Sequence, residues 1–116
     1  MPLIRITGSK NIEEKKKFAI MQSVSQKISE ITGKPEKYIL VIFGDATDMI
    51  LGGTDDSSLF LEIKSIGALQ PENTGKITKE ISEYLFEETG VPLDRINIEF
   101  RDVAPDMWGW NGKTFG

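Results

Sequence analysis

The feature that most constrains the fold of this chain is an internal repeat. Residues 32–45 can be laid over residues 89–102, 57 positions later, and six of the fourteen aligned residues are identical. The same offset brings residues 3–6 over residues 60–63. Two copies of one structural unit, about residues 1–57 and 58–116, explain this pattern most simply. At 116 residues we predict one domain over 1–116 that is built from two similar halves.

Each half has the hydrophobic pattern of a strand, a helix and a second strand. A long helical connection implies that the two strands of a half are parallel and that the crossover is right-handed. We therefore predict an α/β fold of the α+β sandwich type, in which two pseudo-symmetric βαβ units form a four-stranded mixed sheet with two helices on one face. The predicted strands cover residues 3–7, 38–43, 58–66 and 96–100, and the helices cover 12–32 and about 75–89.

The helix ends can be predicted from capping residues. Asn11 or Ser9 is expected to cap the first helix, and Asn73 or Thr74 the second. The first helix should end at Gly33. Apolar side chains recur in it at spacings of three and four, which predicts a stripe that faces the core. This stripe comprises Phe18, Met21, Val24, Ile28 and Ile31.

The segment 38–43 is apolar throughout, apart from the hydroxyl of Tyr38. A strand of this kind is expected to be buried on both faces. Two helices on one face leave the other face of the sheet uncovered. A symmetric homo-oligomer is the economical way to cover it, and we predict one.

The composition excludes several classes of function. The chain contains no Cys and no His, so thiol chemistry, disulfides and the commonest metal-ligand and proton-transfer residues are missing. We expect no metal and no cofactor. The net charge of −4 argues against a nucleic-acid or membrane-surface partner, which would require a concentrated positive field.

The location of the protein is predicted from the absence of apolar segments. No apolar run approaches the roughly 18 residues that span a bilayer, and the first residues lack the apolar core of a signal peptide. We expect a cytoplasmic protein, and signal-independent secretion stays open.

The N-terminus is a candidate site of proton chemistry. Without His or Cys, a base must be a carboxylate, a lysine, a tyrosine or the terminal amine. Removal of Met1 would give Pro2 a free secondary amine, whereas retained Met1 would make the same nitrogen an amide. On residues alone the Met1–Pro2 start indicates only efficient removal of methionine.

The last fourteen residues carry Trp108, Trp110 and Phe115 among glycines, without helical periodicity. This pattern predicts a C-terminal hairpin whose rings pack against a sheet edge or a neighbouring subunit. The same rings are suited to wall a ligand pocket, since such pockets are largely apolar and aromatic.

Five short motifs together resemble the macrophage migration inhibitory factor family over essentially the whole chain. They are Met-Pro at 1–2, Thr-Gly-Lys-Pro at 32–35, Gly-Gly at 52–53, Lys-Ser-Ile-Gly at 64–67 and Gly-Trp-Asn-x-x-Thr-Phe at 109–115. The resemblance implies a tautomerase-superfamily fold, a homotrimer, and keto–enol tautomerase activity on small aromatic keto or enol acids such as phenylpyruvate-like and dopachrome-like compounds.

The resemblance also implies site residues. Pro2 matches the catalytic base of the family, Lys34 matches the lysine that meets the substrate carboxylate, and Ile66 contributes its backbone. Trp110 and Phe115 match the aromatic wall. Burial and a nearby Lys34 ammonium would lower the pKa of the Pro2 amine towards the range in which a base works well. On residues alone, Lys34 is also explained as a cation near a helix C-terminus.

The chain departs from the family at several positions. Trp108 stands where a small aliphatic residue is common, so the pocket mouth is expected to differ. Asn97 and Glu99 stand where the family has a tyrosine and an asparagine supplied by a neighbouring subunit. Ser58 and Leu61 replace the family's two cysteines, so thiol oxidoreductase activity is not expected. The alternative function is a non-catalytic binding or cytokine-like signalling trimer with a relic pocket.

Overall fold

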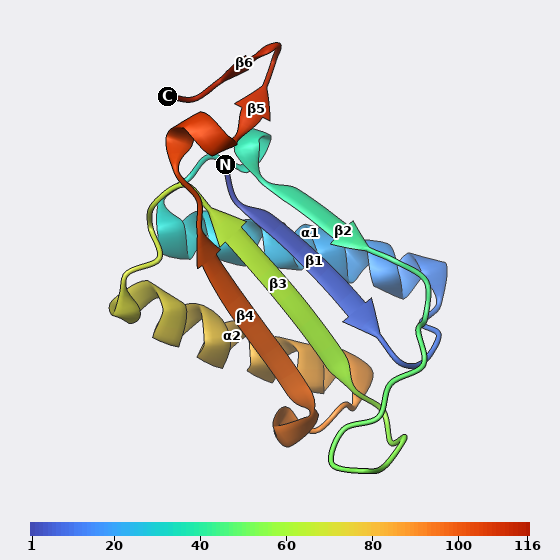
Figure 1. Ribbon diagram of the computed structural model, residues 1–116. Coiled ribbons are helices and arrows are strands. Elements are labelled where there is room, and N and C mark those ends of the chain that lie inside the picture. Colours follow the sequence, from blue (N-terminus) through green and yellow to red (C-terminus); the bar gives the residue numbers. More distant parts are fainter.

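Two strand–helix–strand units share one four-stranded sheet in the computed structural model, which describes residues 1–116 (Figure 1). Strands are parallel within each unit, and the units meet through the antiparallel pair β1–β3, in the order β2-β1-β3-β4. This confirms the predicted mixed sheet and its two βαβ units. The first unit is β1 (Leu3–Gly8), α1 (Glu14–Thr32) and β2 (Leu40–Phe43), and the second is β3 (Leu59–Ser65), α2 (Pro71–Thr89) and β4 (Ile96–Asp102).

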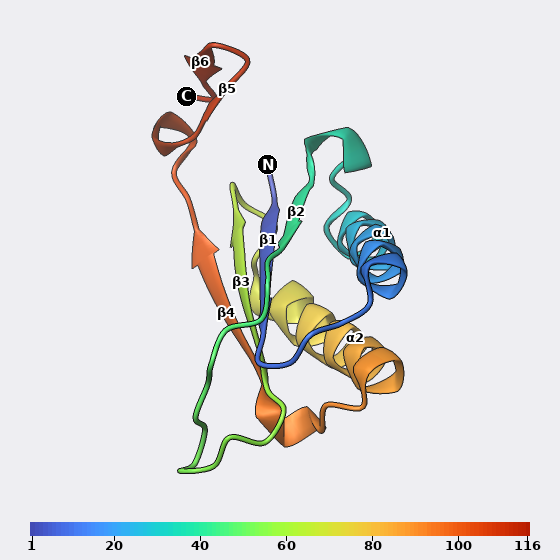
Figure 2. The same ribbon diagram turned by 90° about the vertical axis from the view of Figure 1, so that its right-hand side faces the viewer.

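Both helices cover the same face of the sheet, and the core lies between the two layers (Figure 2). The opposite face, which we call the open face, has no helix over it. Neither helix has the length and apolar character that crossing a membrane requires. The core consists of Ile4, Ile6, Ile20, Val24, Ile28, Leu59, Leu61, Ile63, Ile77, Ile81, Leu85 and Val91.

The repeat extends to individual hydrogen bonds at the ends of the two helices. Thr32 and Thr89 each donate a hydroxyl hydrogen bond of 2.6 Å to the carbonyl four residues earlier. Gly33 and Gly90 follow with φ of 74° and 76°, a left-handed conformation that glycine adopts without a steric penalty. The 3-10 turns η1 (Glu36–Tyr38) and η2 (Leu93–Arg95) come next in each unit. Three of the six identical residues of the repeat, Thr, Gly and Pro, therefore lie where the helix ends and the next turn begins.

The predicted cap of α1 is wrong. The helix begins at Glu14, after Glu13, and no side chain caps it. The Ser9 hydroxyl instead accepts a hydrogen bond of 2.8 Å from the backbone N–H of Ser58, which joins the end of β1 to the start of β3. Asn11 lies in the irregular segment before the helix. The Ser9 oxygen, which the sequence predicted as a helix cap, thus makes a tertiary contact instead.

The predicted cap of α2 is also wrong, because the helix begins earlier, at Pro71. Proline suits the first helical position, since its missing N–H would have no partner there. Asn73 and Thr74 therefore lie inside the first turn. The Asn73 side-chain amide donates a 2.9 Å hydrogen bond back to the Ala68 carbonyl and braces the preceding loop.

The apolar stripe of α1 differs from the predicted one at its N-terminal end. Phe18 is 62% exposed, whereas Ile20, which was not predicted, is fully buried. Ile20, Val24 and Ile28 repeat every four residues and point at the sheet. Met21 is only half-buried and lines a surface hollow beside Phe18 at the edge of the sheet, so its prediction as a core residue is not met.

The strand predicted over 38–43 begins at Leu40, because residues 36–38 form the turn η1. It is also an edge strand, and the prediction of two buried faces is wrong for the single chain. Leu40 is 51% exposed, and the other three residues of β2 are half-buried. The apolar side chains on the open face are covered by nothing within the chain.

The C-terminal hairpin is present, as predicted. After the turn η3 (Pro105–Met107), β5 (Gly109–Trp110) pairs antiparallel with β6 (Lys113–Thr114). The hairpin lies beyond the end of the sheet near the N-terminus, apart from the helical layer (Figure 2).

One arginine holds the long connection between β2 and β3. The Arg95 guanidinium donates hydrogen bonds to four backbone carbonyls of this connection, at 2.9–3.2 Å. Backbone carbonyls outside regular structure need such partners when they are removed from water. The acceptors are Leu51, Thr54, Asp56 and Ser57.

We predict that Arg95→Met destabilises the protein by about 1.5–3 kcal/mol, because hydrogen bonds to charged groups contribute on that scale and the carbonyls lose their donor. Urea unfolding at fixed protein concentration measures the effect. Lys79→Met is the matched control, since Lys79 makes only an exposed ion pair with Glu83. Equal stability of the two variants would contradict this role of Arg95.

Candidate active site

The N-terminus lies at one end of the sheet, where β1 begins between its two neighbouring strands. Pro2 is fully buried, and its carbonyl accepts a hydrogen bond of 3.0 Å from the N–H of Leu40. Met1 precedes it, and the terminal amine is on Met1 in this form of the chain. Loss of Met1 would transfer the amine to Pro2 at the same end of the sheet.

The terminal amine is in an environment that disfavours its charge. Burial lowers the pKa of the Met1 amine below its ordinary value, and the Lys34 ammonium lowers that pKa further. Backbone hydrogen bonds of Lys34 fix its position just after Gly33. The Ser29 hydroxyl donates to its carbonyl at 2.7 Å, and its own N–H donates to the Thr32 hydroxyl at 3.2 Å. The end of α1 therefore presents a cation to the N-terminus.

An aromatic group lies at the same end of the molecule. The rings of Trp110 and Phe115 stack with centroids 6.0 Å apart and an interplanar angle of 11°. Tyr38 meets Trp110 edge-on, with centroids 5.3 Å apart. Tyr38 lies two residues before Leu40, which bonds to Pro2. The three rings thus connect the hairpin to the N-terminal end of the sheet.

Tyr38 is a candidate site residue that the sequence analysis did not select. The signal was its hydroxyl, the single polar group in an otherwise apolar segment. Ile66 lies near the same end of the sheet as the N-terminus. Continuing the antiparallel register of β1 and β3 beyond Leu3 brings Ser65 beside Pro2 and Ile66 beside Met1. The Ser65 hydroxyl is buried and has no hydrogen-bond partner within the chain.

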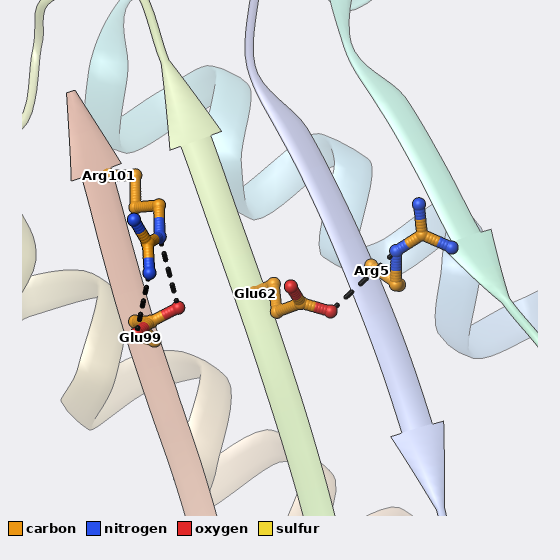
Figure 3. A network of polar contacts seen from close by, with 4 residues as sticks. All are labelled: Arg5, Glu62, Glu99 and Arg101. Atoms are coloured by element: carbon orange, nitrogen blue, oxygen red, sulfur yellow. Dashed lines mark hydrogen bonds and ion pairs between the residues drawn. The ribbon is translucent and has the colours of Figure 1, made fainter. Parts of the chain in front are cut away.

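Two predicted site residues lie elsewhere on the sheet. Asn97 and Glu99 point out from the open face of β4 (Figure 3 shows Glu99). Glu99 is two strands away from β1 and forms an ion pair of 3.3 Å with Arg101. Trp108 accepts a backbone hydrogen bond of 3.2 Å from the N–H of Phe115 and lines a hollow with Lys64 and with Leu3, the residue after Pro2. A single chain therefore brings the other predicted site residues to one end of the sheet and separates them from Asn97 and Glu99.

The arrangement can bind and deprotonate an acidic carbon acid. Lowering the pKa of the terminal amine increases the fraction that is unprotonated and can act as a base. A lysine ammonium beside it can pair with a carboxylate, and the aromatic rings can contact an apolar body. The chain has no group of three or more side chains positioned to hold a metal ion.

Comparison with known proteins identifies the class. A homologue of macrophage migration inhibitory factor from Prochlorococcus marinus has a solved structure that superposes with a TM-score of 0.92, at 36% identity, over 98% of this chain and 99% of that one. The "MIF-like protein mif-2" of Caenorhabditis elegans is 32% identical over 98% of this chain and 94% of its own. A homologue from Brugia malayi is 30% identical over 84% and 85%.

The paired βαβ sheet and its relatives define a protein with the fold of macrophage migration inhibitory factor. The family model described as "Macrophage migration inhibitory factor (MIF)" matches residues 1–116. The chain belongs to the macrophage migration inhibitory factor family, which confirms the resemblance seen in the sequence.

We predict that Lys34→Met raises the pKa of the terminal amine only part of the way towards its ordinary value. The positive neighbour is removed, while burial, the larger cause, stays. The rate of amine labelling by an arylating reagent, followed against pH, reports this pKa. Lys79→Met on α2 is the charge-matched control. An unchanged titration in Lys34→Met would show that Lys34 does not act on the amine.

Proposed function

We propose that the protein is a keto–enol tautomerase of small aromatic keto acids, with the Pro2 amine as general base after removal of Met1. The observation that carries the proposal is the terminal amine of lowered pKa beside Lys34, at the end of the sheet where three aromatic rings gather. Membership in the family supports it. In the Met1-bearing form the Pro2 nitrogen is an amide and cannot be the base.

The proposed reaction needs only one base and one cation. The neutral Pro2 amine removes a proton from the carbon next to the ketone, and the electron pair of that C–H bond forms the carbon–carbon double bond. The carbonyl oxygen takes up the displaced electron pair and then a proton, which gives the enol. Lys34 holds the substrate carboxylate and stabilises the negative charge that develops. Tyr38, Trp110 and Phe115 contact the aromatic body.

We propose further that the working assembly is a homotrimer in which a neighbouring subunit completes each site. The uncovered open face and the edge strand β2, with Leu40 51% exposed, support an interface between copies of the chain. Asn97 and Glu99 lie on that open face, far from Pro2 of their own chain. A neighbour would bring them to the site.

We predict that Pro2→Gly lowers kcat/KM for phenylpyruvate tautomerisation by at least about a hundredfold, because general base catalysis contributes about 10²–10⁴. The assay uses protein that intact mass shows to be free of Met1. A pH profile should show activity rising as the amine loses its proton, with an apparent pKa below that of a solvent-exposed prolyl amine, because burial and Lys34 lower the pKa of an amine at this end of the sheet.

The same variant separates the two functions considered. If the protein is a binding or signalling trimer with a relic pocket, Pro2→Gly leaves its function intact. Full turnover by a preparation that retains Met1 would contradict Pro2 as the base. Lys37→Met is a matched control for general effects of charge near the site, because Lys37 lies over the Tyr38 ring at 5.0 Å and is assigned no role in the reaction.

We predict that Glu99→Asn raises kcat/KM for phenylpyruvate by a few fold. A carboxylate supplied by a neighbour would repel an anionic substrate and favour the protonated amine. The ion pair with Arg101 weakens this repulsion without removing it. Steady-state kinetics between pH 5 and 9 measure the effect, and identical values across that range would exclude Glu99 from the site.

A further inference from the structure

One buried side-chain polar atom of the chain has no hydrogen-bond partner, and it is the hydroxyl oxygen of Ser65. Ser65 is the last residue of β3 and is 1% exposed. A buried polar group without a partner costs free energy, so its presence requires a physical reason. Ser58, which is also buried and precedes β3 at its other end, differs because its hydroxyl donates a 3.1 Å hydrogen bond to the Asp56 carbonyl.

The strand register places the Ser65 hydroxyl beside Pro2. Leu3 lies opposite Lys64 in the antiparallel pair of β1 and β3, and the next pair outwards is Pro2 and Ser65. Both of these residues are buried, so both side chains face the helical layer. Residues directly opposite in an antiparallel pair have Cβ atoms about 4.5–5.5 Å apart. The proline nitrogen belongs to the same ring as the proline Cβ, which brings this nitrogen close to the Ser65 side chain.

The form of the N-terminus decides whether these two groups can bond. In the Met1-bearing chain the Pro2 nitrogen is a tertiary amide, which has no N–H to donate and no free lone pair. After loss of Met1 the same nitrogen is a secondary amine with one N–H and one lone pair. The N–H of that amine would give the Ser65 hydroxyl the partner that it lacks in the Met1-bearing chain.

The charged residues of the surrounding elements do not take the place of this hydroxyl. Lys34, at the end of α1, is the charged side chain that acts on the pKa of the terminal amine, and an ammonium offers no acceptor. β2 is apolar throughout. Lys64 of β3 points to the open face, and Glu36 of η1 lines a surface hollow between α1 and β2. The Ser65 hydroxyl is therefore the side-chain acceptor that strand pairing offers to the amine.

We propose that Ser65 is a positioning residue, whose hydroxyl oxygen accepts the N–H of the Pro2 amine and thereby directs the amine lone pair towards the substrate. This inference rests on the proposed function of Pro2 as the base. A secondary amine has a single N–H, so a fixed N–H direction also fixes the direction of the lone pair. When the amine takes a proton from the substrate carbon, the second N–H forms on the substrate side. The bond to Ser65 is kept, and Ser65 gains and loses no proton.

The proposed contact has a defined effect on the pKa of the amine. An ammonium N–H makes a stronger hydrogen bond to the serine oxygen than a neutral amine N–H does, so the contact favours the charged form. It therefore offsets part of the lowering of the pKa that burial and Lys34 cause. In Met1-free protein Ser65→Ala should lower the pKa of the Pro2 amine, as measured by amine labelling against pH. Ser65→Thr, which keeps a hydroxyl, should leave that pKa unchanged.

The kinetic effect should lie in kcat. On the high-pH plateau the amine is unprotonated in both proteins, and only the direction of its lone pair differs. There Ser65→Ala should lower kcat for phenylpyruvate about two- to tenfold, the factor that corresponds to one neutral hydrogen bond. The value of KM should stay the same, because Ser65 contacts the amine and not the substrate. Ser65→Thr should restore kcat.

A stability comparison tests the contact without any assay of turnover. Met1-bearing and Met1-free protein, identified by intact mass, are unfolded thermally at one protein concentration. In the Met1-bearing form Ser65→Ala should leave Tm unchanged or raise it, because it removes a hydroxyl without a partner. In the Met1-free form it should lower Tm by about 2–6 °C. Ser58→Ala is the matched control and should lower Tm equally in both forms, because its bond to the Asp56 carbonyl does not involve the N-terminus.

Two results would overturn the proposal. One is an equal effect of Ser65→Ala on the Tm of the two N-terminal forms. The other is an unchanged or raised pKa of the Pro2 amine in Ser65→Ala, since a raised pKa would mean that the hydroxyl donates to the lone pair and blocks the base. Failure of the proposed function gives a different result. In that case Met1-free protein has no tautomerase activity, while the difference in Tm and the lowered pKa still demonstrate the contact between Ser65 and the amine.

Discussion

The antiparallel pairing of β1 with β3 is the interaction on which the rest of the structure depends. Six residue pairs join the two units there. Two of these pairs, Ile4 with Ile63 and Ile6 with Leu61, face the core and are at most 1% exposed. A single βαβ unit has only two strands and one helix, too little to bury a core. Joined at this pair, the units form one sheet whose inner face both helices cover. Burial of these branched apolar side chains contributes favourable free energy where the two units join.

The central position of β1 also decides the environment of the chain terminus. A terminal amine is ordinarily solvated, but here it begins an inner strand whose second residue is fully buried. The end of α1 then brings Lys34 to the same place, since its glycine turn reverses the chain towards β2. Burial and charge act in the same direction on the pKa of the amine. The fold that closes the core thus also increases the fraction of the amine that is unprotonated.

The open face of the sheet carries charged side chains, most of which form ion pairs with one another. Glu62 and Glu99 lie opposite each other across β3 and β4, as Lys64 and Arg101 do, and each of these arrangements alone would be repulsive. The ion pairs with Arg5 and Arg101 compensate the carboxylates. The open face has three cations and two carboxylates, so one cation is left without an opposite charge. Lys64 is the cation of this face that forms no ion pair within the chain.

The sequence by itself determined the two-unit architecture, the strand and helix types and most of the core, because periodicity and helix-ending residues such as Gly33 and Gly90 act locally. The absence of His and Cys limited the base to a carboxylate, a lysine, a tyrosine or the terminal amine, and the family resemblance selected the amine among them. Only the tertiary structure decided that Ser9 bonds to Ser58, that Phe18 is exposed while Ile20 is buried, and that Tyr38 joins the aromatic group. These depend on contacts between segments far apart in the chain. Glu99 lies beside Arg101 and away from Pro2 of its own chain, which the sequence could not show, because strand order and register determine which charges lie together.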